Sequence, residues 1–436
     1  MDGVIISFII LLIALFIGVP IPFAFFTSAL IIVLIEGYDP SFLIPYGYQK
    51  AGSIILIAVP LFILSGSIME KGHIGEKLVD VVEIIFGRIR GGLGAVSVVS
   101  CALFGAISGS GAATLACIGT IMFPRLEAAG YPRGYSASLL SNACVLGLLI
   151  PPSLSMILFA FVAAQSVLAC FLATVVPGII LVIFMCIVNF VYLRNNKGII
   201  VTENYNFPTT MKLLRKKSFV ALPAFLMPVI ILGGIYGGAM TPTEAAAISV
   251  LYALPVGLFI YKGINKTNIK ETFLAPGVTS GVILTMLLGV MILSRLYIME
   301  NVPNRLLAAL SMISDNPAVI LIILNIFMIV VGMLMDDTSA ILLSTPILLP
   351  VAVAIGVEPI HFAAIMGVNT GLGCVTPPCA PFLYLGSRLG KAPVNEMLRS
   401  TFALILFAWI PTLLLTTYVP EISLWLPRLI LGPMAL

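Results

Sequence analysis

The sequence predicts an all-α polytopic membrane protein that contains two structural repeats, and three observations support this prediction. Only 9% of the 436 residues are charged and 60% are hydrophobic, whereas soluble domains carry about 25% charged residues. Apolar runs close to the roughly 20 residues that cross a bilayer recur along the chain. Residues that break helices also fall at matching places in the two halves of the sequence.

The first apolar run, Val4–Ile35, is expected to be a retained transmembrane helix. A signal peptide would carry a basic start and an apolar stretch of only about 7–15 residues. This run has no basic start and is longer. Further candidate spans are Ile54–Met69, Phe171–Leu193, Phe219–Tyr236 and Ile320–Met335.

A basic polar stretch at 194–218 separates the two hydrophobic halves, which we assign as repeats 1–193 and 219–436. Positive loops stay on the cytoplasmic side of a membrane, so this connector is predicted to be cytoplasmic. A simple solvated loop is compatible with the same pattern. Its basic residues, set against the single acid Glu203, are Arg194, Lys197, Lys212, Arg215, Lys216 and Lys217.

The two halves align without a gap when IPPS at 150–153 is placed over TPPC at 376–379. Sequence identity in this alignment is low, but the breakers coincide. Because breakers fix backbone geometry, their coincidence predicts an internal structural repeat. The matched pairs are Pro124 with Pro350, Gly130 with Gly356, Ala137 with Ala363, and Gly147 with Gly373.

Each repeat is predicted to contain the same three elements in the same order. The first is an amphipathic arm helix, at 73–90 and at 300–315, that braces the membrane interface. The second is a re-entrant helical hairpin, at 91–124 and at 319–350, and the third is a Pro-interrupted helix, at 135–161 and at 360–386. In the first arm the apolar residues with helical spacing are Ile74, Leu78, Val81, Ile85 and Ile89.

The hairpin prediction depends on small or polar residues in the middle of apolar segments. The first half has SGSG at 108–111 and the second has DDTS at 336–339. Irregular backbone at membrane depth is tolerated only inside protein or against a cavity. The alternative is a pair of short helices that are joined by a turn at the surface.

The two Pro-Pro sites predict ion binding. Proline removes an N–H and disfavours helix at the residue before it, so nearby carbonyls lose their partners. Free carbonyls that face a cavity suit a hard cation, and exposed helix N-termini attract anions. A proline kink in a packed helix is the alternative.

Three ionisable residues in apolar segments are candidate site residues, since charge inside a membrane is costly. Asp336 and Asp337 occupy the second hairpin tip, and Arg295 could pair with a substrate carboxylate. The alternatives are that Arg295 extends toward Glu300 and that Asp337 caps a helix.

TPTEAAA at 241–247 is explained more simply as a helix start, with Thr241 or Thr243 as N-cap and Glu244 as its partner.

The chain resembles the large membrane subunit, DctM type, of tripartite ATP-independent periplasmic (TRAP) transporters. The resemblance implies inverted repeats, scaffold helices, and a domain of two hairpins and two broken helices that moves as an elevator. It spans nearly the whole chain in order. Its motifs are FGAISGSGAAT, GTIMFPRLEAAGYPRGYSASLL, GLLIPPS, GAMTPTEAAA, GMLMDDTSAILLSTPILLP and NTGLGCVTPP.

The resemblance also implies site residues for sodium ions, with no organic cofactor. Asp336 and Arg295 are expected to meet the substrate. The first sodium site would use Ser108, Gly111, Gly147, Ile150 and Pro152. The second would use Asp336, Ser339, Gly373, Thr376 and Pro378.

The expected function is sodium-coupled uptake of an organic acid, such as a C4-dicarboxylate or sialic acid, across the bacterial inner membrane. The implied partners are a periplasmic substrate-binding protein, the lipid bilayer and a small four-helix membrane subunit, with no nucleic acid. The small subunit is expected to be a separate chain, because this sequence starts directly at the large-subunit region.

Other functions have less support from the sequence. A carrier of the same superfamily that works without a binding protein is the closest alternative. An intramembrane serine hydrolase needs a base beside its serine, and neither His73 nor His361 is placed near Ser108 or Ser110. No P-loop motif for an ATP-driven pump is present, and closed hairpins favour alternating access over a channel. The seven cysteines lie in apolar segments without metal or disulfide spacing. We expect the protein to have no enzyme activity.

Overall fold

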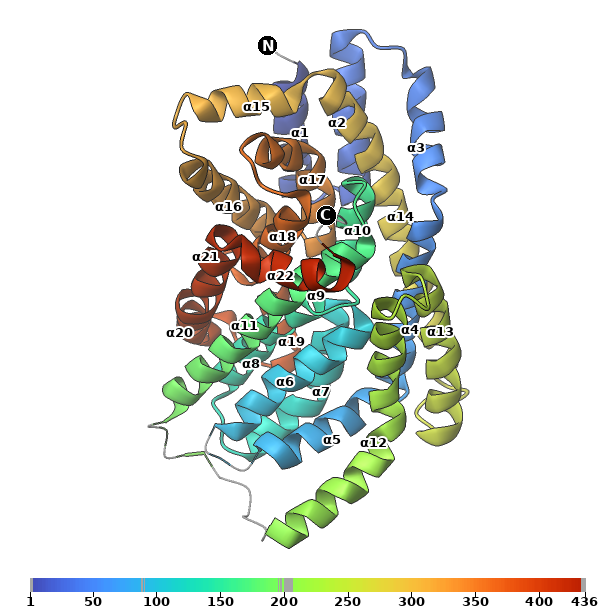
Figure 1. Ribbon diagram of the computed structural model, residues 1–436, viewed down its shortest axis with the longest axis vertical. Coiled ribbons are helices and arrows are strands. Elements are labelled where there is room, and N and C mark those ends of the chain that lie inside the picture. The colour runs from blue at the N-terminus through green and yellow to red at the C-terminus, as the bar shows by residue number, and fades with distance from the viewer. Residues whose placement is uncertain are drawn as a thin grey trace.

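The computed structural model describes residues 3–432 except 88, 90, 195, 197 and 200–206, and for 207–212 it describes the backbone alone. Across these residues the chain is helical and contains no strand (Figure 1). Eight of the described helices, or nine if one bent pair counts as a single span, are long and apolar enough to cross a membrane. The prediction of an all-α polytopic membrane protein is confirmed.

The first apolar run is divided into two helices, so the prediction of a single transmembrane helix there is wrong. Helix α1 (Gly3–Ile17) and helix α2 (Ile21–Glu36) pack against each other. Gly18, with a φ of +89°, and Pro20 turn the chain between them. The interface includes a buried pair of hydroxyls, Ser7 Oγ and Ser28 Oγ, which are 2.6 Å apart.

A group of helices that we call the scaffold lies beside these two. It contains α3 (Leu43–Ala51), α4 (Ala58–Lys71), α12 (Phe207–Tyr236), α13 (Pro242–Pro255) and α14 (Ile269–Met299). Helix α4 packs on α13 and α14, and α14 also packs on α2 and α3. Helix α13 begins as predicted: Glu244 N donates to Thr241 Oγ1 over 3.3 Å and Thr241 N donates to Glu244 Oε2 over 2.8 Å. Thr241 is therefore the N-cap.

Two helical hairpins have the positions that the repeat predicts. Hairpin 1 consists of α6 (Gly92–Ser108) and α7 (Gly111–Ala128), and hairpin 2 of α16 (Pro317–Leu334) and α17 (Asp337–Ala354). Adding 226 to the numbers of α7 gives those of α17. The tip of hairpin 1 is not at the surface, because Ser108 is only 1% exposed. This burial favours the hairpin over two short helices with a surface turn at the first tip.

The two Pro-Pro sites interrupt helices, as expected. In the first half, α8 (Arg133–Ala143) and α9 (Leu146–Leu149) are followed by α10 (Leu154–Val162), with a bend of 45° at the break. In the second half, α18 (Pro359–Val375) is followed by α19 (Pro381–Gly390). The two interrupted helices pack against each other where α9 meets α18. We call the hairpins and interrupted helices together the hairpin region.

The arm helices are shorter than predicted and lie at different levels of the molecule. Helix α5 (Ile74–Phe86) lies in the lower half of Figure 1, and α15 (Val302–Ser311) at its upper end, as inverted repeats require. Ile74 and Leu78 of α5 are buried. Ile85 and Ile89, however, are 55% and 57% exposed. The predicted apolar face therefore packs inward only along its first half.

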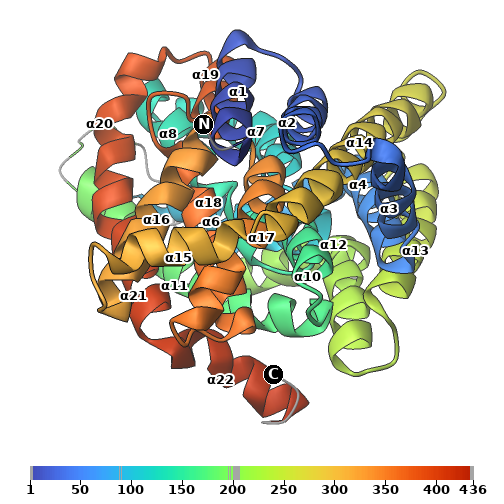
Figure 2. The same cartoon turned by 90° about the horizontal axis from the view of Figure 1, so that it is seen from above.

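Long helices complete both repeats. Helix α11 (Val167–Leu193) corresponds in the second repeat to two helices, α20 (Val394–Leu404) and α21 (Ile410–Tyr418), which a short π-helix joins. The last helix, α22 (Pro420–Leu431), packs on α11. Viewed from above, α3, α4 and α13 lie on one side of the molecule and α8, α20 and α21 on the other (Figure 2). The basic connector is partly helical rather than a loop, because α12 begins at Phe207.

Candidate functional site

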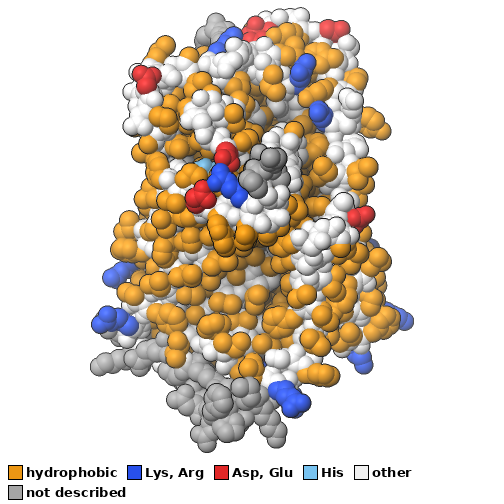
Figure 3. Space-filling model, viewed as in Figure 1, with side chains coloured by type: hydrophobic (Ala, Val, Ile, Leu, Met, Phe, Trp, Pro, Cys, Tyr) orange, Lys and Arg blue, Asp and Glu red, His pale blue; other side chains and the backbone are white. Residues whose placement is uncertain are grey.

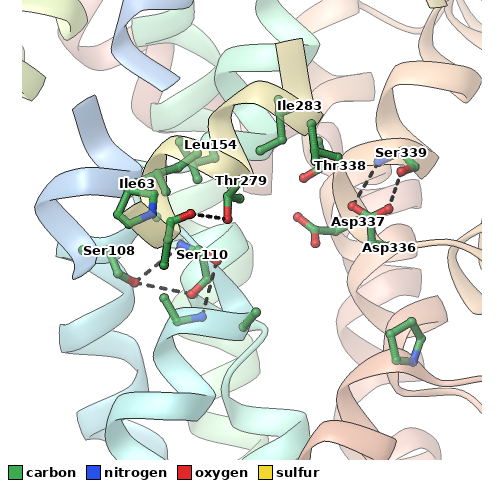
Figure 4. A pocket seen from close by; sticks show the side chains of 18 of the residues that line it. Ile63, Ser108, Ser110, Leu154, Thr279, Ile283, Asp336, Asp337, Thr338 and Ser339 are labelled. Atoms are coloured by element: carbon green, nitrogen blue, oxygen red, sulfur yellow. Dashed lines mark hydrogen bonds between the residues drawn. The ribbon is translucent and has the colours of Figure 1, made fainter. Parts of the chain in front are cut away.

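A cavity of about 720 Å³ separates the hairpin region from the scaffold. The tips of both hairpins line it, through 108–110 of hairpin 1 and 336–339 of hairpin 2. The scaffold contributes Glu70 from α4 and Thr279 and Ile283 from α14. Figure 4 shows the two tips facing each other across this space. Both tips therefore meet at one site, although 226 residues separate their sequences.

The tip of hairpin 1 is a tight turn that rests on the first helix break. Gly109 has a φ of +63°, and a Cβ there would lie 2.6 Å from the Pro152 carbonyl oxygen, so the position requires glycine. Its own carbonyl accepts a bond from Leu154 N at 3.1 Å. Ser110 caps α7 by accepting from Ala113 N at 3.4 Å. Ser110 therefore belongs to the turn.

Three oxygens gather where this tip meets Gly147. Thr114 Oγ1 donates to the Ser110 carbonyl over 2.8 Å and lies 3.1 Å from Ser108 Oγ. A Cβ on Gly147 would be 2.9 Å from Thr114 Oγ1 and 3.1 Å from the Ser110 carbonyl oxygen. The structure thus brings together Ser108, Gly147 and Pro152 of the predicted first sodium site. It adds Thr114, which the sequence reasoning missed although it lies one helical turn after Ser110.

The other two predicted residues of this site border it. A Cβ on Gly111 would lie 3.4 Å from the Cys144 carbonyl oxygen, on the way into the break. Ile150 ends α9 with an extended backbone. A Cβ on Gly178 of α11 would meet the Ile150 side chain at 3.1 Å, so that side chain is directed toward α11. Ile150 could therefore contribute to a cation site through its backbone only.

The tip of hairpin 2 has the same backbone course but uses a carboxylate. Asp336 is the N-cap of α17, accepting from Ser339 N at 3.4 Å and from the Ser339 hydroxyl. The alternative that Asp337 is the cap is therefore wrong. Ser339 is fully buried, and its hydroxyl also lies 3.0 Å from Met286 Sδ of α14.

Asp337 reaches across to the other repeat. Its Oδ2 accepts a hydrogen bond of 2.6 Å from Ser155 Oγ, in the first turn of α10. The tip of hairpin 1 makes the reciprocal contact, since a Cβ on Gly111 would lie 2.8 Å from the ring of Phe382 at the start of α19. Each hairpin tip therefore touches the second half of the other repeat's interrupted helix. No sequence pattern within one repeat indicated this exchange.

The second break packs against the side of its hairpin. A Cβ on Gly373 would lie 2.7 Å from both Gly332 Cα and the Ile329 carbonyl oxygen, in the last two turns of α16. Thr376 donates its hydroxyl to the Leu372 carbonyl over 2.6 Å. The Pro378 carbonyl accepts from Tyr384 Oη at 3.0 Å. Of the second predicted sodium site, Asp336 and Ser339 are hydrogen-bonded together, while Gly373, Thr376 and Pro378 make other contacts.

Arg295 lies away from the cavity. Its side chain is exposed, and its guanidinium carbon is 5.7 Å from the centre of the Tyr46 ring. Glu300, its alternative partner, instead accepts from Tyr38 Oη at 2.5 Å and pairs with Arg305 at 3.6 Å. Among the described cavity-lining residues there are acids but no lysine or arginine. The role of Arg295 as a substrate ligand stays a prediction.

Two further observations limit the chemistry of the site. The described residues include no group of three or more His, Cys, Asp or Glu side chains placed to hold a metal ion. A cation here would depend mainly on carbonyl and hydroxyl oxygens, with the Asp336 carboxylate beside them at the second tip. His361 Nε2 lies 2.7 Å from the Thr416 carbonyl oxygen, and the side chain of His73 is 60% exposed near Glu76. Neither histidine contacts Ser108.

Taken together, paired hairpins and interrupted helices around one cavity, beside a helical scaffold, define the class of polytopic membrane transporters with internal repeats. The particular family follows from the sequence comparison. The profile described as "Tripartite ATP-independent periplasmic transporter, DctM component" matches residues 8–422. The chain belongs to this family, which is one of transport proteins and not of enzymes.

Curated relatives carry several substrate names. The C4-dicarboxylate TRAP transporter large permease protein DctM of Pseudomonas aeruginosa is 33% identical over 381 residues, covering 87% of this chain and 88% of the relative. The sialic acid TRAP transporter large permease protein SiaM of Vibrio cholerae is 31% identical, with 96% and 97% covered. The isethionate TRAP transporter permease protein DctMQ of Oleidesulfovibrio alaskensis is 30% identical, with 94% and 64% covered.

A solved structure has the same fold. The YdaH transporter of Alcanivorax borkumensis superposes with a TM-score of 0.59 over 87% of this chain and 88% of its own, at 12% identity. At this identity the similarity concerns the fold alone. It agrees with the predicted fold class.

Proposed function

We propose that this protein takes up an organic acid together with sodium ions, by moving its hairpin region as one body against the scaffold. The observation that carries the proposal is the meeting of both hairpin tips at one cavity between these two regions. Binding sites at the interface of repeats, formed by interrupted helices, are typical of alternating access.

Sodium binding is supported by the oxygens at the two tips. At the first tip, the hydroxyls of Ser108 and Thr114 and the carbonyl of Ser110 lie together in a buried position beside Gly147. At the second, the Ser339 hydroxyl donates to the Asp336 carboxylate. Desolvated oxygen clusters of this kind bind a hard cation well. Gly147, Ile150 and Pro152 at the first break, and Gly373, Thr376 and Pro378 at the second, would add carbonyl oxygens.

An organic acid fits the cavity only if its charge is balanced there. The described lining contains Glu70, Asp336 and Asp337 and no basic side chain. Bound sodium ions would supply the missing positive charge, and the N-termini of α7, α10 and α17 would attract a carboxylate. Sodium and substrate would then bind together. The names of the relatives, C4-dicarboxylate and sialic acid, are those of carboxylates and agree with this proposal.

The level of α22 supports movement of the hairpin region. Arg428 on this helix pairs with Glu421 at 2.6 Å and with Glu358 at 2.9 Å. Helix α22 lies at mid-height of the molecule, well below α15, and a small charged cluster at this height interrupts the hydrophobic surface (Figures 1 and 3). Because charges need water, α22 would face an aqueous space that lies below the level of α15. A vertical displacement of the hairpin region would account for this difference in level.

The proposed setting is the bacterial inner membrane, with the basic connector in the cytoplasm. The family description names a tripartite periplasmic transporter. We therefore propose two protein partners, a small membrane subunit and a periplasmic substrate-binding protein. The name DctMQ of one relative is compatible with a small subunit that is fused to the large one in that protein.

Uptake of labelled organic acids into proteoliposomes would test this function. The protein would be reconstituted with its partner chains, with and without an inward sodium gradient and with and without the binding protein. We expect uptake only when both are present. Full uptake without the binding protein would indicate an autonomous carrier, and uptake without sodium would overturn the coupling.

A further inference from the structure

A second, basic cavity lies far from the transport site, between the arm helix α5 and the start of α12. Its volume is about 200 Å³, and Lys77 and Asp80 of α5 line it together with Leu213, Lys216, Lys217 and Val220 of α12. None of these residues lines the cavity between the hairpin tips. The transport proposal therefore leaves this cavity without a role.

The lining of this cavity carries an excess of positive charge. Three lysines line it against one acid, Asp80. That acid is already paired, with Arg125 Nη2 at 3.0 Å and Lys217 Nζ at 3.8 Å. Lys77 lies 3.8 Å from Glu76, whereas Lys216 has no ion-pair partner among the side chains that the structure describes. A bound anion would balance this charge.

The cavity continues onto an open, mainly apolar surface of α12. Lys216 and Val220 also line a neighbouring space of about 710 Å³, together with Arg215, Ser218, Phe219 and Leu222. Phe219 is 78% exposed, and Val220 and Leu222 are about half exposed. These residues lie inside the candidate membrane span Leu213–Tyr236. The lysines therefore lie at the level where the chain enters the bilayer, with apolar side chains directly beyond them.

We propose that this cavity binds the phosphate group of an anionic phospholipid, with one acyl chain lying along Phe219 and Leu222. Lys77, Lys216 and Lys217 would contact the phosphate. Basic pockets between helices on the cytoplasmic side are suited to anionic headgroups. The apolar surface beside the lysines favours a lipid over a free phosphate ion, which would occupy only the basic cavity. A lipid bound here would connect the arm helix to the scaffold.

Lipid-dependent stabilisation of the full-length protein tests the site. Wild type and K77Q/K216Q would be placed in phosphatidylcholine nanodiscs with or without phosphatidylglycerol, and thermal unfolding and retained lipid would be measured. We expect phosphatidylglycerol to stabilise the wild type and to bind the variant about thirtyfold more weakly. Lys217 stays unchanged so that the pair with Asp80 is kept. K262Q/K266Q, which changes the same charge in the loop before α14, is the control and should behave as wild type.

Two further measurements distinguish a bound lipid from a free phosphate ion. Inorganic phosphate, added to the phosphatidylcholine sample, should give no comparable stabilisation, and Phe219→Ser should weaken the effect of phosphatidylglycerol. An equal effect of inorganic phosphate would show an anion site and overturn the lipid proposal. If K262Q/K266Q lost as much phosphatidylglycerol binding as K77Q/K216Q, the binding would depend on general surface charge and not on this cavity. Loss of bound lipid when the small subunit is present would assign this surface to that subunit.

Discussion

The two hairpin tips share a backbone course but differ in chemistry. The first is neutral, and its hydroxyls and carbonyl gather directly on Gly147 of the following break. The second carries two carboxylates, of which Asp336 caps its own helix and Asp337 bonds to Ser155 of the other repeat. Both breaks pack against the last turn of the first hairpin helix, Gly147 on Gly105 of α6 and Gly373 on Gly332 of α16.

This difference teaches that the repeat preserves the breakers more closely than the ligands. Glycine and proline fix where helices stop, and both halves keep them at the same spacing. The side chains at the tips are free to diverge, because a cation can be held by neutral oxygens or by a carboxylate. We therefore expect the two proposed sodium sites to differ in affinity and in response to mutation.

The largest expected effect is that of Gly109→Ala. The new Cβ would meet the Pro152 carbonyl oxygen at 2.6 Å at a φ of +63°, which displaces the tip from its break. We expect uptake in proteoliposomes to be lost. Gly356→Ala is the matched control, because Gly356 has a φ of +89° but open space around it. It should cost only the backbone strain, about 1–2 kcal/mol, and retain uptake. Normal uptake by Gly109→Ala would show that transport does not require the tip of hairpin 1 to pack closely on the first helix break.

Next in size is the effect of Asp336→Asn. The amide can still cap α17 but loses the charge that would hold a cation. Charged interactions contribute about 1.5–3 kcal/mol, so the half-saturating sodium concentration should rise about 10–100-fold. Asp337→Asn keeps an acceptor for Ser155 Oγ and should shift the sodium curve much less. A larger shift of the sodium curve for Asp337→Asn than for Asp336→Asn would place the second sodium site at Asp337.

A smaller effect is expected for Thr114→Val, which removes one neutral oxygen from the first site. The half-saturating sodium concentration should rise about 2–10-fold, since a neutral hydrogen bond contributes about 0.5–1.5 kcal/mol. Ser110→Ala is the control. It removes only the cap to Ala113 N, and should lower thermal stability by about 1 kcal/mol while leaving the sodium curve unchanged. Identical curves for Thr114→Val and wild type would exclude this hydroxyl from the site.

The smallest effect is expected for Arg295→Ala. In this structure the side chain only lies over the Tyr46 ring, at 5.7 Å. Loss of such an exposed contact should cost about 0.5–1 kcal/mol of stability, and uptake by the variant tests the predicted role of Arg295 as a substrate ligand. Tyr46→Leu should have the same small effect on thermal unfolding. Abolished uptake with unchanged stability would instead establish Arg295 as the substrate ligand that the family resemblance implies.

Much of the fold could be predicted because it depends on local properties. Long apolar runs specify membrane helices, and SGSG, DDTS and the two Pro-Pro pairs specify where helices stop. The prediction of one helix over the first apolar run is wrong, because Gly18 and Pro20 end one helix and begin the next within it. The predicted apolar face of α5 is buried only along its first half. Ile85 is exposed within the helix, and the helix ends at Phe86, before Ile89.

The sequence by itself determined the membrane setting, the repeat, the hairpins and the breaks, since each of these follows from the hydrophobicity and backbone preferences of neighbouring residues. Only the tertiary structure decided which oxygens meet. Thr114 joins Ser108 beside Gly147, Asp337 crosses to Ser155, and Arg295 lies outside the cavity. These contacts depend on how helices from distant parts of the chain pack, and pattern within one segment does not carry that information.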